Sequence, residues 1–460
     1  MLFKIDACVK INVSMNRKYK VLLVLAALSA SMFIAGGKAQ AATLEVTGGC
    51  TLAIAIDSAN AGSDQAGCTA TGDTYGTNDT ITLADGTYTL TADLPVITTS
   101  VDVIGQSMTG TIIDGDAQTY SGLKVDGAGL SSNLSDFTIQ NMLNGGLNVD
   151  NGAAVIINRV IAQGNTASAG GGLVVTNGAS VTLNESILQN NTADNAGGGF
   201  SNAGGTAVIS NSTIYNNTGQ FGGGGVLLFS GTTTIINTTI AGNIAAQGAG
   251  ITSFSDPVAT IINTTIYGNT ADGAAGGVTI LQTSGSISFQ NTIIAGNTVS
   301  DCDGDGTITP TSNGGNLSSG SSCTFLTEPT DITGTAPLVA SLTPEDNGGP
   351  TPTIALLDGS PALNAGVATD APSTDQRGQA RPQGSGFDIG AYELVVAPSE
   401  SVAPTDTTSA ANLAGVGAPN TGLGKQASST AKQQTLVILI TTLFVALISR
   451  IRYKKFNQKY

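Results

Sequence analysis

The chain has 460 residues, with 61 glycines, no tryptophan, no histidine and only 5% aromatic residues. The lack of histidine excludes Ser-His-Asp and Cys-His nucleophilic sites, and it excludes zinc sites with histidine ligands. The net charge is −15, and residues 42–421 hold 31 acidic but only four basic residues, so we expect a surface that repels nucleic acid.

Residues 1–41 have the pattern of a secretory signal peptide. Basic residues between Met15 and Lys20 precede an apolar run over residues 21–34, and the small-residue site Ala39-Gln40-Ala41 follows. This order predicts cleavage after Ala41 and export of the remainder. An uncleaved N-terminal membrane anchor is the alternative.

Four cysteines remain beyond the expected cleavage site: Cys50, Cys68, Cys302 and Cys323. An even number of cysteines in an exported chain predicts disulfide bonds. Proximity in the sequence pairs Cys50 with Cys68 and Cys302 with Cys323. Each bond would close a loop of about 20 residues and contribute about 3 kcal/mol.

Residues 121–300 are periodic. An asparagine three residues before an isoleucine recurs at intervals of 26, 27, 26, 26 and 28 residues. These asparagines are Asn158, Asn184, Asn211, Asn237, Asn263 and Asn291. Glycine clusters around Gly171, Gly198, Gly224, Gly250 and Gly277 keep nearly the same period. Two landmarks in phase indicate a stacked repeat.

Each repeat is predicted to form one coil of a parallel β-helix. Short β-branched runs such as residues 232–236 favour strands over helices, and three strands fit in about 26 residues. We expect the repeated asparagines to adopt the αL conformation at a corner and to hydrogen-bond along the axis as a ladder. The isoleucines should point inward: Ile161, Ile187, Ile214, Ile240, Ile266 and Ile294. An antiparallel sandwich is the alternative, which a constant period without hairpin dipeptides disfavours.

The segments on both sides of the repeat resemble known families. Residues 50–60 (CTLAIAIDSAN) and 78–90 (NDTITLADGTYTL) resemble the N-terminal cap of CSLREA-type surface proteins, with Ile-Ala where that family has Arg-Glu. Residues 346–353 (DNGGPTPT), 375–378 (DQRG) and 388–393 (DIGAYE) resemble the choice-of-anchor Q domain. The resemblance implies an all-β, right-handed parallel β-helix of the pectin-lyase-like fold, with a cap at each end.

A candidate cation loop follows the repeat. Asp301, Asp303 and Asp305 have the D-x-D-x-D-G spacing that presents carboxylates to Ca²⁺ around a glycine turn. The twelfth position is Ser312, where an EF-hand has a bidentate glutamate. The alternative is an acidic turn without a metal, and we expect no other cofactor.

An enzyme on the same fold, a polysaccharide lyase or glycosidase, is the alternative to a non-catalytic protein. The repeats contain only two basic residues, Lys124 and Arg159, which lie far apart in coil number, and we expect no Asp-Asp pair of the kind that galacturonases use. Anionic uronates would also meet a strongly negative surface. Two further arginines, Arg377 and Arg381, lie in the cap motif beside acidic residues, where we expect an internal set of ion pairs.

The C-terminus resembles a cell-wall sorting signal. The pentapeptide Ala418-Pro419-Asn420-Thr421-Gly422 is similar to LPxTG, with alanine in place of leucine, and it precedes an apolar run over residues 436–448 and a basic tail. The resemblance implies a sortase-like transpeptidase that joins Thr421 to the envelope. The alternative is a plain transmembrane anchor, since the apolar run is short but long enough to span with flanking residues.

These patterns predict six regions: a signal peptide (1–41), an N-terminal cap with the first coils (42–120), the repeats (121–300), a last coil with a choice-of-anchor Q-like cap (301–395), a linker with the sorting motif (396–434), and a transmembrane helix with a basic cytoplasmic tail (435–460). We therefore expect an exported, envelope-anchored, non-catalytic protein that serves adhesion or surface display. Its partner would be a carbohydrate or another cell surface.

Overall fold

The computed structural model describes residues 41–72, 74–76, 78–304 and 307–395. Residues 1–40 of the expected signal peptide, the sorting motif at 418–422 and the expected transmembrane helix at 435–460 lie outside these residues. Within the described part of the chain, no helix is long and apolar enough to cross a membrane.

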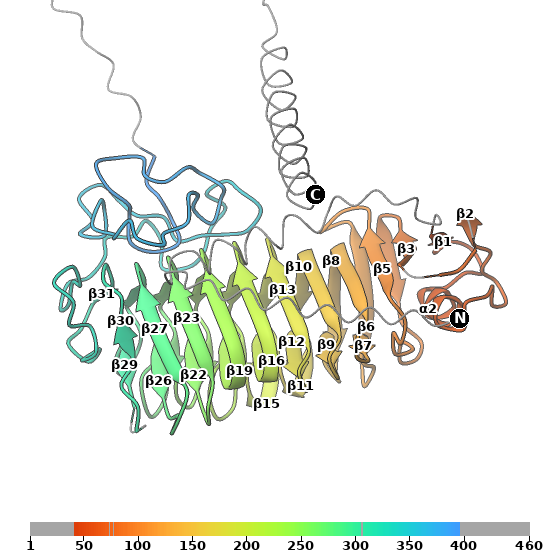
Figure 1. Cartoon of the computed structure of the whole chain (residues 1–460), viewed down its shortest axis with the longest axis horizontal. Coiled ribbons are helices and arrows are strands. Elements are labelled where there is room, and N and C mark those ends of the chain that lie inside the picture. The colour runs from red at the N-terminus through yellow and green to blue at the C-terminus, as the bar shows by residue number, and fades with distance from the viewer. Residues whose placement is uncertain (1–40, 73, 77, 305–306, 396–460) are drawn as a thin grey trace, which may run out of the picture. The chain divides into compact units, whose positions relative to one another are not determined.

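The described residues wind into a right-handed β-solenoid of about nine turns (Figure 1). Its strands form one 26-stranded sheet that continues around the corners and a separate five-stranded sheet. Except for β2 (Thr71–Gly72), which pairs antiparallel with β1 (Ala42–Glu45), the named strands pair in parallel with strands of neighbouring turns. The strands therefore fall into four stacks along the axis.

The four stacks follow one another within each turn. Stack 1 contains β7 (Leu123–Asp126), β9 (Leu147–Asp150), β12 (Leu173–Thr176), the starts of β16 (Phe200–Ser210) and β19 (Val226–Ile236), β22 (Ile251–Ser253), β26 (Val278–Ile280) and β29 (Cys302–Asp303). Stack 2 contains β1, β3 (Asp79–Leu83), β5 (Val101–Gly105), the starts of β8 (Ser131–Met142) and β10 (Ala154–Gln163), β13 (Ser180–Asn184), the ends of β16 and β19, β23 (Val258–Ile262), β27 (Ser286–Gln290) and β30 (Thr311–Ser312).

Stack 3 contains β4 (Gly86–Thr89), β6 (Thr111–Gln118), the ends of β8 and β10, β14 (Ile187–Gln189), β17 (Thr213–Tyr215), β20 (Thr239–Ala241), β24 (Thr265–Tyr267), β28 (Ile293–Ala295) and β31 (Leu317–Ser318). Stack 4 is the five-stranded sheet: β11 (Thr166–Ala169), β15 (Thr192–Ala196), β18 (Thr218–Gly219), β21 (Ile244–Ala245) and β25 (Thr270–Ala271).

The register shows why the sequence period is so regular. The first residues of the stack 2 segments are aligned from coil to coil at Ala154, Ser180, Thr206, Thr232, Val258 and Ser286. Four successive steps are therefore 26 residues and the last is 28. Side chains alternate along each strand, so one set fills the axis with Val, Ile, Leu and Phe.

Two of the expected inward isoleucines point outward. The inward column of stack 3 is Ile139, Ala162, Leu188, Ile214, Ile240, Ile266 and Ile294. Ile161 and Ile187 precede the inward residues of their coils, so our expectation for these two was wrong. The cause is a one-residue shift of the motif: Asn184 aligns with Ser210, not with Asn211.

The corner asparagines show the same shift between stacks 2 and 3. Asn211, Asn237, Asn263 and Asn291 have positive φ, but Arg159 and Glu185 hold that conformation in the two preceding coils. Side-chain hydrogen bonds link Asn158, Asn184, Asn211 and Asn237 in series, and a further bond links Asn291 to Asn263. Between Asn237 and Asn263 the described contacts contain no such bond: Asn263 donates to the Gly390 carbonyl instead, and Asn237 Oδ1 has no partner. Asn237 also donates to the Thr374 carbonyl of the last described segment.

A second asparagine column lies inside the solenoid, where the chain turns from stack 3 to stack 4. We call it the inner asparagine ladder: Asn165, Asn191, Asn217, Asn243, Asn269 and Asn297. The first five are fully buried. From Asn191 onward, each carboxamide oxygen accepts from the backbone N–H of the preceding ladder asparagine, for example Asn191 N to Asn217 Oδ1 at 2.9 Å. The oxygen of Asn165, the first member, accepts from the Met142 N–H. Each carboxamide nitrogen donates to a backbone carbonyl of the neighbouring coil, as Asn217 does to Leu188 at 2.9 Å.

The glycine clusters in the sequence pack against this ladder. A Cβ atom added at Gly199 would lie 2.9 Å from Asn217 Nδ2, and one added at Gly225 would lie 2.9 Å from Asn243 Nδ2. Only glycine leaves room for the amide at this position of the coil. The glycine landmark of the sequence therefore marks the contact between each coil and the inner asparagine ladder.

Both ends of the apolar core are closed. At the N-terminal end, α2 (Leu52–Ala61) buries Leu52, Ala55 and Ile56, and the Cys50–Cys68 disulfide lies next to it. The helix begins at the N-cap Thr51 and ends at Gly62 in the αL conformation. At the other end Phe325 packs on Phe289, with ring centroids 5.2 Å apart, beside the Cys302–Cys323 disulfide. Both expected disulfides are confirmed.

The last described segment, residues 332–395, runs along the side of the solenoid rather than over its end; we call it the side segment (Figure 1). It packs on the outer face of stack 3, where Ile354, Leu356 and Ile389 bury against Tyr267 and Ile293. Hydrogen bonds join it to Thr213, Thr239 and Thr265 in three successive coils.

Asn217→Ala should destabilise the solenoid strongly. It removes the acceptor of the Asn191 N–H and the donor to the Leu188 carbonyl, and an unpaired buried polar group costs roughly 1–3 kcal/mol. We therefore expect the free energy of unfolding to fall by about 2–4 kcal/mol in urea denaturation. Asn216→Gly is the matched control, because Asn216 is exposed and already has φ 55°. Equal effects of the two changes would contradict the role of the ladder.

Candidate functional site

The first aspartate of the candidate cation loop has a structural role, because hydrogen bonds from the chain occupy both of its carboxylate oxygens. Asp301 is buried and ends the inner asparagine ladder: its Oδ1 accepts from Asn297 N and Nδ2, and its Oδ2 accepts from Ser318, Ser319 and Gly320. Asp303 is exposed and accepts from the Gly304 N–H, and Asp305 lies outside the described residues. The described residues contain no cluster of three potential metal-ligating side chains.

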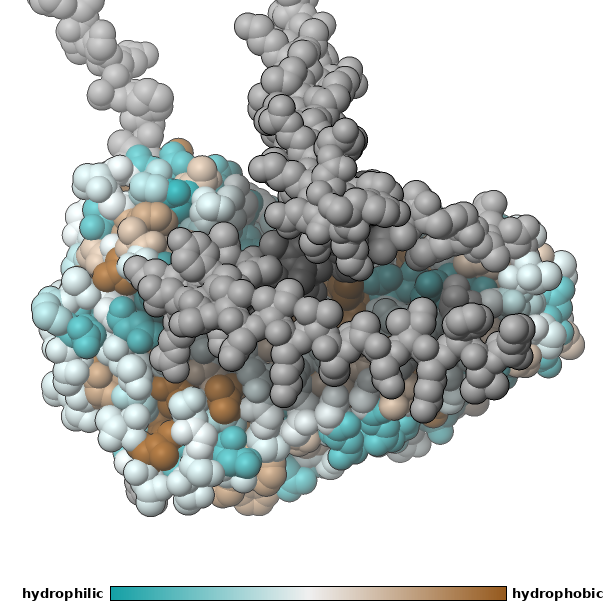
Figure 2. Space-filling model, viewed as in Figure 1, coloured by the Kyte–Doolittle hydropathy of each residue, from teal (hydrophilic) through white to brown (hydrophobic). Residues whose placement is uncertain are grey.

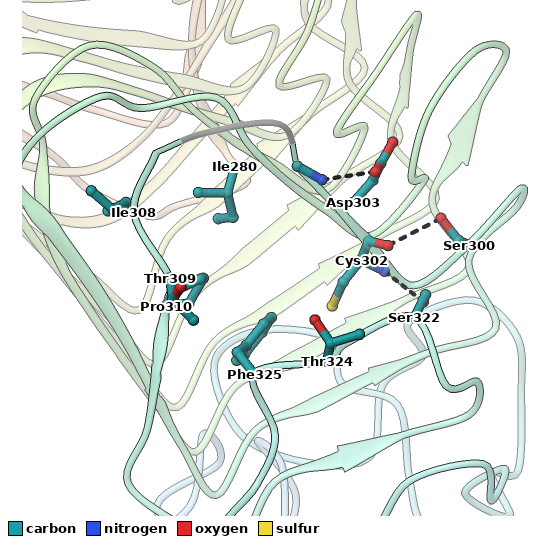
Figure 3. A pocket seen from close by; sticks show the side chains of 11 residues that line it. Ile280, Ser300, Cys302, Asp303, Ile308, Thr309, Pro310, Ser322, Thr324 and Phe325 are labelled. Atoms are coloured by element: carbon teal, nitrogen blue, oxygen red, sulfur yellow. Dashed lines mark hydrogen bonds between the residues drawn. The ribbon is translucent and has the colours of Figure 1, made fainter.

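A hollow of about 550 Å³ lies beside this loop at the C-terminal end of stack 1 (Figure 3). Ile280, Ile308 and Phe325 line it together with Cys302 and Asp303. Polar groups drawn there bond to one another: Cys302 N donates to Ser322 Oγ, and Ser300 Oγ donates to the Cys302 carbonyl. These bonds occupy polar groups that a ligand would need, so the hollow is a poor candidate for a polar binding site.

The arginines of the cap motif form the expected ion pairs inside the side segment. Arg381 is buried and donates to Glu393 Oε2 at 2.8 Å and to the carbonyls of Asp388 and Gly390. Arg377 bonds Asp375 through both Nε and Nη2, and its guanidinium lies 3.6 Å from the centre of the Tyr392 ring. This network holds the loops of the side segment together.

Burial sets the protonation of this network. It raises the pKa of Glu393 and of Asp388, and it lowers the pKa of Arg381. Each carboxyl also accepts backbone N–H bonds, from Asp388 and Gln383 to Glu393 and from Leu394 and Asn364 to Asp388. The charges are enclosed and hydrogen-bonded within the segment, which suits a structural role.

Gln376 fastens the side segment to the coils. Its carbonyl oxygen accepts from Thr239 Oγ1 at 2.7 Å, and its amide donates to Thr213 Oγ1 at 3.0 Å. The same amide donates to Thr351 and to the Pro352 carbonyl within the side segment. One buried side chain thus joins two coils to the covering segment.

The coils bring together one group of charged side chains that the sequence pattern did not reveal. Asp126 at the end of β7 and Asp150 at the end of β9 are aligned on adjacent coils, and Lys124 Nζ lies 2.7 Å and 3.4 Å from their carboxylates. The two aspartates are 24 residues apart, which is one coil, so the spacing was a usable signal. We call these three residues the Lys124 cluster.

All three members of the Lys124 cluster are held in their charged forms. The hydrogen bond with Asp126 raises the pKa of Lys124, and the same bond lowers the pKa of Asp126. Burial alone would raise the pKa of Asp150, but hydrogen bonds from Thr176, Asn177 and Asn151 bring it below its ordinary value. A general acid needs a raised carboxyl pKa and a lysine base needs a lowered one. The cluster has the opposite shifts.

A pair of phenylalanines lies on the surface of the solenoid, next to outward-facing residues of stack 2 that carry no charge. The rings of Phe229 and Phe254 are stacked, with centroids 6.0 Å apart and planes at 10°. Both side chains are more than 40% exposed. Figure 2 shows that most of the visible surface is of intermediate hydropathy, with separate small apolar patches.

One family model and two solved structures are similar to this chain. The family model for the right-handed beta helix region matches residues 121–299 and confirms the expected β-helix. The crystal structure of pectate lyase Pel9A is 17% identical, with 68% of this chain and 88% of that chain covered and a TM-score of 0.39. The Azotobacter vinelandii mannuronan C-5 epimerase AlgE6 A-module is 15% identical, with 58% and 84% covered and a TM-score of 0.24. No curated protein matches the chain.

Arg381→Met should lower the free energy of unfolding of the side segment by about 3–5 kcal/mol, because it leaves the Glu393 carboxylate buried without its cation. A carboxyl with a raised folded-state pKa weakens the fold above that pKa, so the loss should be largest at neutral pH. It should shrink as the pH falls through the raised pKa of Glu393. Urea denaturation at several pH values, with limited proteolysis of residues 332–395, measures both effects.

Arg159→Met is the control for this change, because Arg159 is 48% exposed in its side chain and pairs only with Asp136 among the described ion pairs. We expect it to cost less than about 1 kcal/mol. A similar cost and a similar pH dependence for the two variants would contradict a structural role for the Arg381–Glu393 pair.

Proposed function

We propose that the chain is a non-catalytic cell-surface protein that serves adhesion or surface display. One observation carries this proposal: all four basic side chains of the described residues pair with carboxylates of the same chain. Polysaccharide lyases and glycosidases need a cation, a base or a proton donor that is free to meet the substrate. Here the cations are neutralised internally, while most of the carboxylates leave the surface negative.

A carbohydrate-active enzyme on the same fold is the second candidate, and the Lys124 cluster is the observation that favours it. Two carboxylates and an ammonium group on adjacent coils are the residue types that such chemistry uses. Their charged, mutually neutralised state is what makes this the weaker candidate.

An assay of turnover separates these two candidates. The purified chain is mixed with a panel of acidic and neutral polysaccharides, and reducing ends and unsaturated products are measured. We expect neither to form. Asp126→Asn and Asp150→Asn test any activity that is found, with Asp136→Asn as the matched control, since Asp136 pairs with Arg159 elsewhere on the solenoid. Turnover that the first two changes abolish and the control preserves would overturn the non-catalytic proposal.

We further propose that the chain is exported and held on the envelope through the sorting motif. The two disulfides support export, because such bonds persist in oxidising compartments. The resemblance of the flanking segments to CSLREA and choice-of-anchor Q proteins supports surface display. The sorting motif, residues 418–422, is outside the described residues, so its support is the sequence alone.

Thr421→Ala tests the attachment. With a sortase-like enzyme as partner, the wild-type chain should resist detergent extraction because Thr421 is joined covalently to the envelope. The variant should dissolve at full length. Wild-type protein that dissolves intact would leave only the apolar segment at residues 436–448 as the anchor.

A further inference from the structure

The outward face of stack 2 is free of charge over six consecutive coils. Its first row, at the start of each strand, is exposed, and its second row is exposed at Ile156 and half-buried beyond it. The first row is Ala154, Ser180, Thr206, Thr232, Val258 and Ser286, and the second row is Ile156, Thr182, Val208, Thr234, Thr260 and Ser288. We call these twelve residues the stack 2 face.

This lack of charge contrasts with the rest of the body. Residues 42–421 hold 31 acidic residues, yet the charged residues nearest in sequence to the stack 2 face lie at its borders. Asp256 lies in the turn before β23, and Arg159 and Glu185 lie at the corners that follow the stack 2 segments of β10 and β13. A ligand placed on the face would therefore bury hydroxyl and methyl groups, with no charge to desolvate.

The face is also regular. Strands of successive coils are about 4.8 Å apart, and the two outward rows are about 6.6 Å apart along each strand. Hydroxyl groups and methyl groups thus repeat along the axis in a regular array. In Figure 1 the strands of this stack run side by side across the solenoid. Such an array suits a ligand that is itself a repeating polymer.

The phenylalanine pair borders this face. Phe229 and Phe254 follow the last residues of stack 1 in adjacent coils and precede Thr232 and Val258, which open the stack 2 segments of those coils. Phe229 is 42% exposed and Phe254 is 46% exposed. The stacked pair presents an apolar aromatic surface to solvent at the edge of the face, which a ligand can cover.

From these observations we propose that the stack 2 face and the Phe229–Phe254 pair bind an uncharged polysaccharide. The aliphatic face of a sugar ring packs on the phenylalanines, while sugar hydroxyls exchange hydrogen bonds with the threonine and serine rows. The lack of charge on the face matches a neutral polymer, whereas a polyanion would meet the acidic body. This assignment rests on the proposed adhesive function and names its ligand class.

Binding isotherms with insoluble neutral polysaccharides (cellulose, chitin and mannan) test the proposal on the purified full-length chain, with pectate as the acidic comparison. We expect binding to at least one neutral polymer and none to pectate. Phe229→Ser combined with Phe254→Ser should weaken binding roughly tenfold or more. Thr234→Glu should weaken it as well, because it places a charge in the middle of the face.

Leu342→Ser is the matched control, since Leu342 is 69% exposed but lies in the side segment over stack 3. Circular dichroism of each variant checks that the fold is kept. Absence of binding to neutral polymers, or binding that the phenylalanine changes leave unaltered, would overturn the assignment. The assignment would also be overturned if sedimentation showed that the wild-type chain is a dimer and the double phenylalanine variant a monomer. That result would mean that Phe229 and Phe254 join two copies of the chain. None of these outcomes bears on the proposal that the chain is non-catalytic, because that proposal is contradicted only by products formed in the polysaccharide turnover assay.

Discussion

The rest of the structure depends on the inner asparagine ladder. Each ladder carboxamide takes the place of an inward apolar side chain and satisfies backbone groups of neighbouring coils at the turn from stack 3 to stack 4. Because the amides must meet coil after coil, the coil length stays close to 26 residues, and glycines such as Gly199 and Gly225 leave room for the amides. Asp301 ends the series by accepting from Asn297 and three groups of the last coil.

Much of the fold was predictable because a solenoid repeats its constraints in the sequence. The period of Asn158 to Asn291 predicted stacked coils, and cysteine spacing predicted both disulfides. The inner ladder was missed although its spacing is more regular: each ladder asparagine follows Gly or Asn, from Gly164-Asn165 to Gly296-Asn297. The corner motif has nearly the same period, but it shifts by one residue between Asn184 and Asn211. This shift is why the sequence pattern wrongly predicted that Ile161 and Ile187 point inward.

Contacts between distant parts of the chain were harder to predict. Gln376 reaches Thr239 across 137 residues, and nothing in a local pattern indicates that the side segment would cover stack 3 instead of the end of the core. The Lys124 cluster was missed for another reason. Its carboxylates are one coil apart, so they are neighbours in space without being neighbours in sequence. The stack 2 face became visible only when the register had fixed which residues point outward.

Native-state hydrogen exchange tests the central role of the ladder most directly. The backbone N–H groups of Asn191, Asn217 and Asn243 donate to buried carboxamides, so they should exchange only when the whole solenoid unfolds. The N–H groups of the half-buried corner residues Glu185 and Asn211 donate to backbone carbonyls of the next coil, and they should exchange sooner through local opening. Ladder amides that exchange as fast as the corner amides would contradict this role, because the coils would then be held together by other contacts.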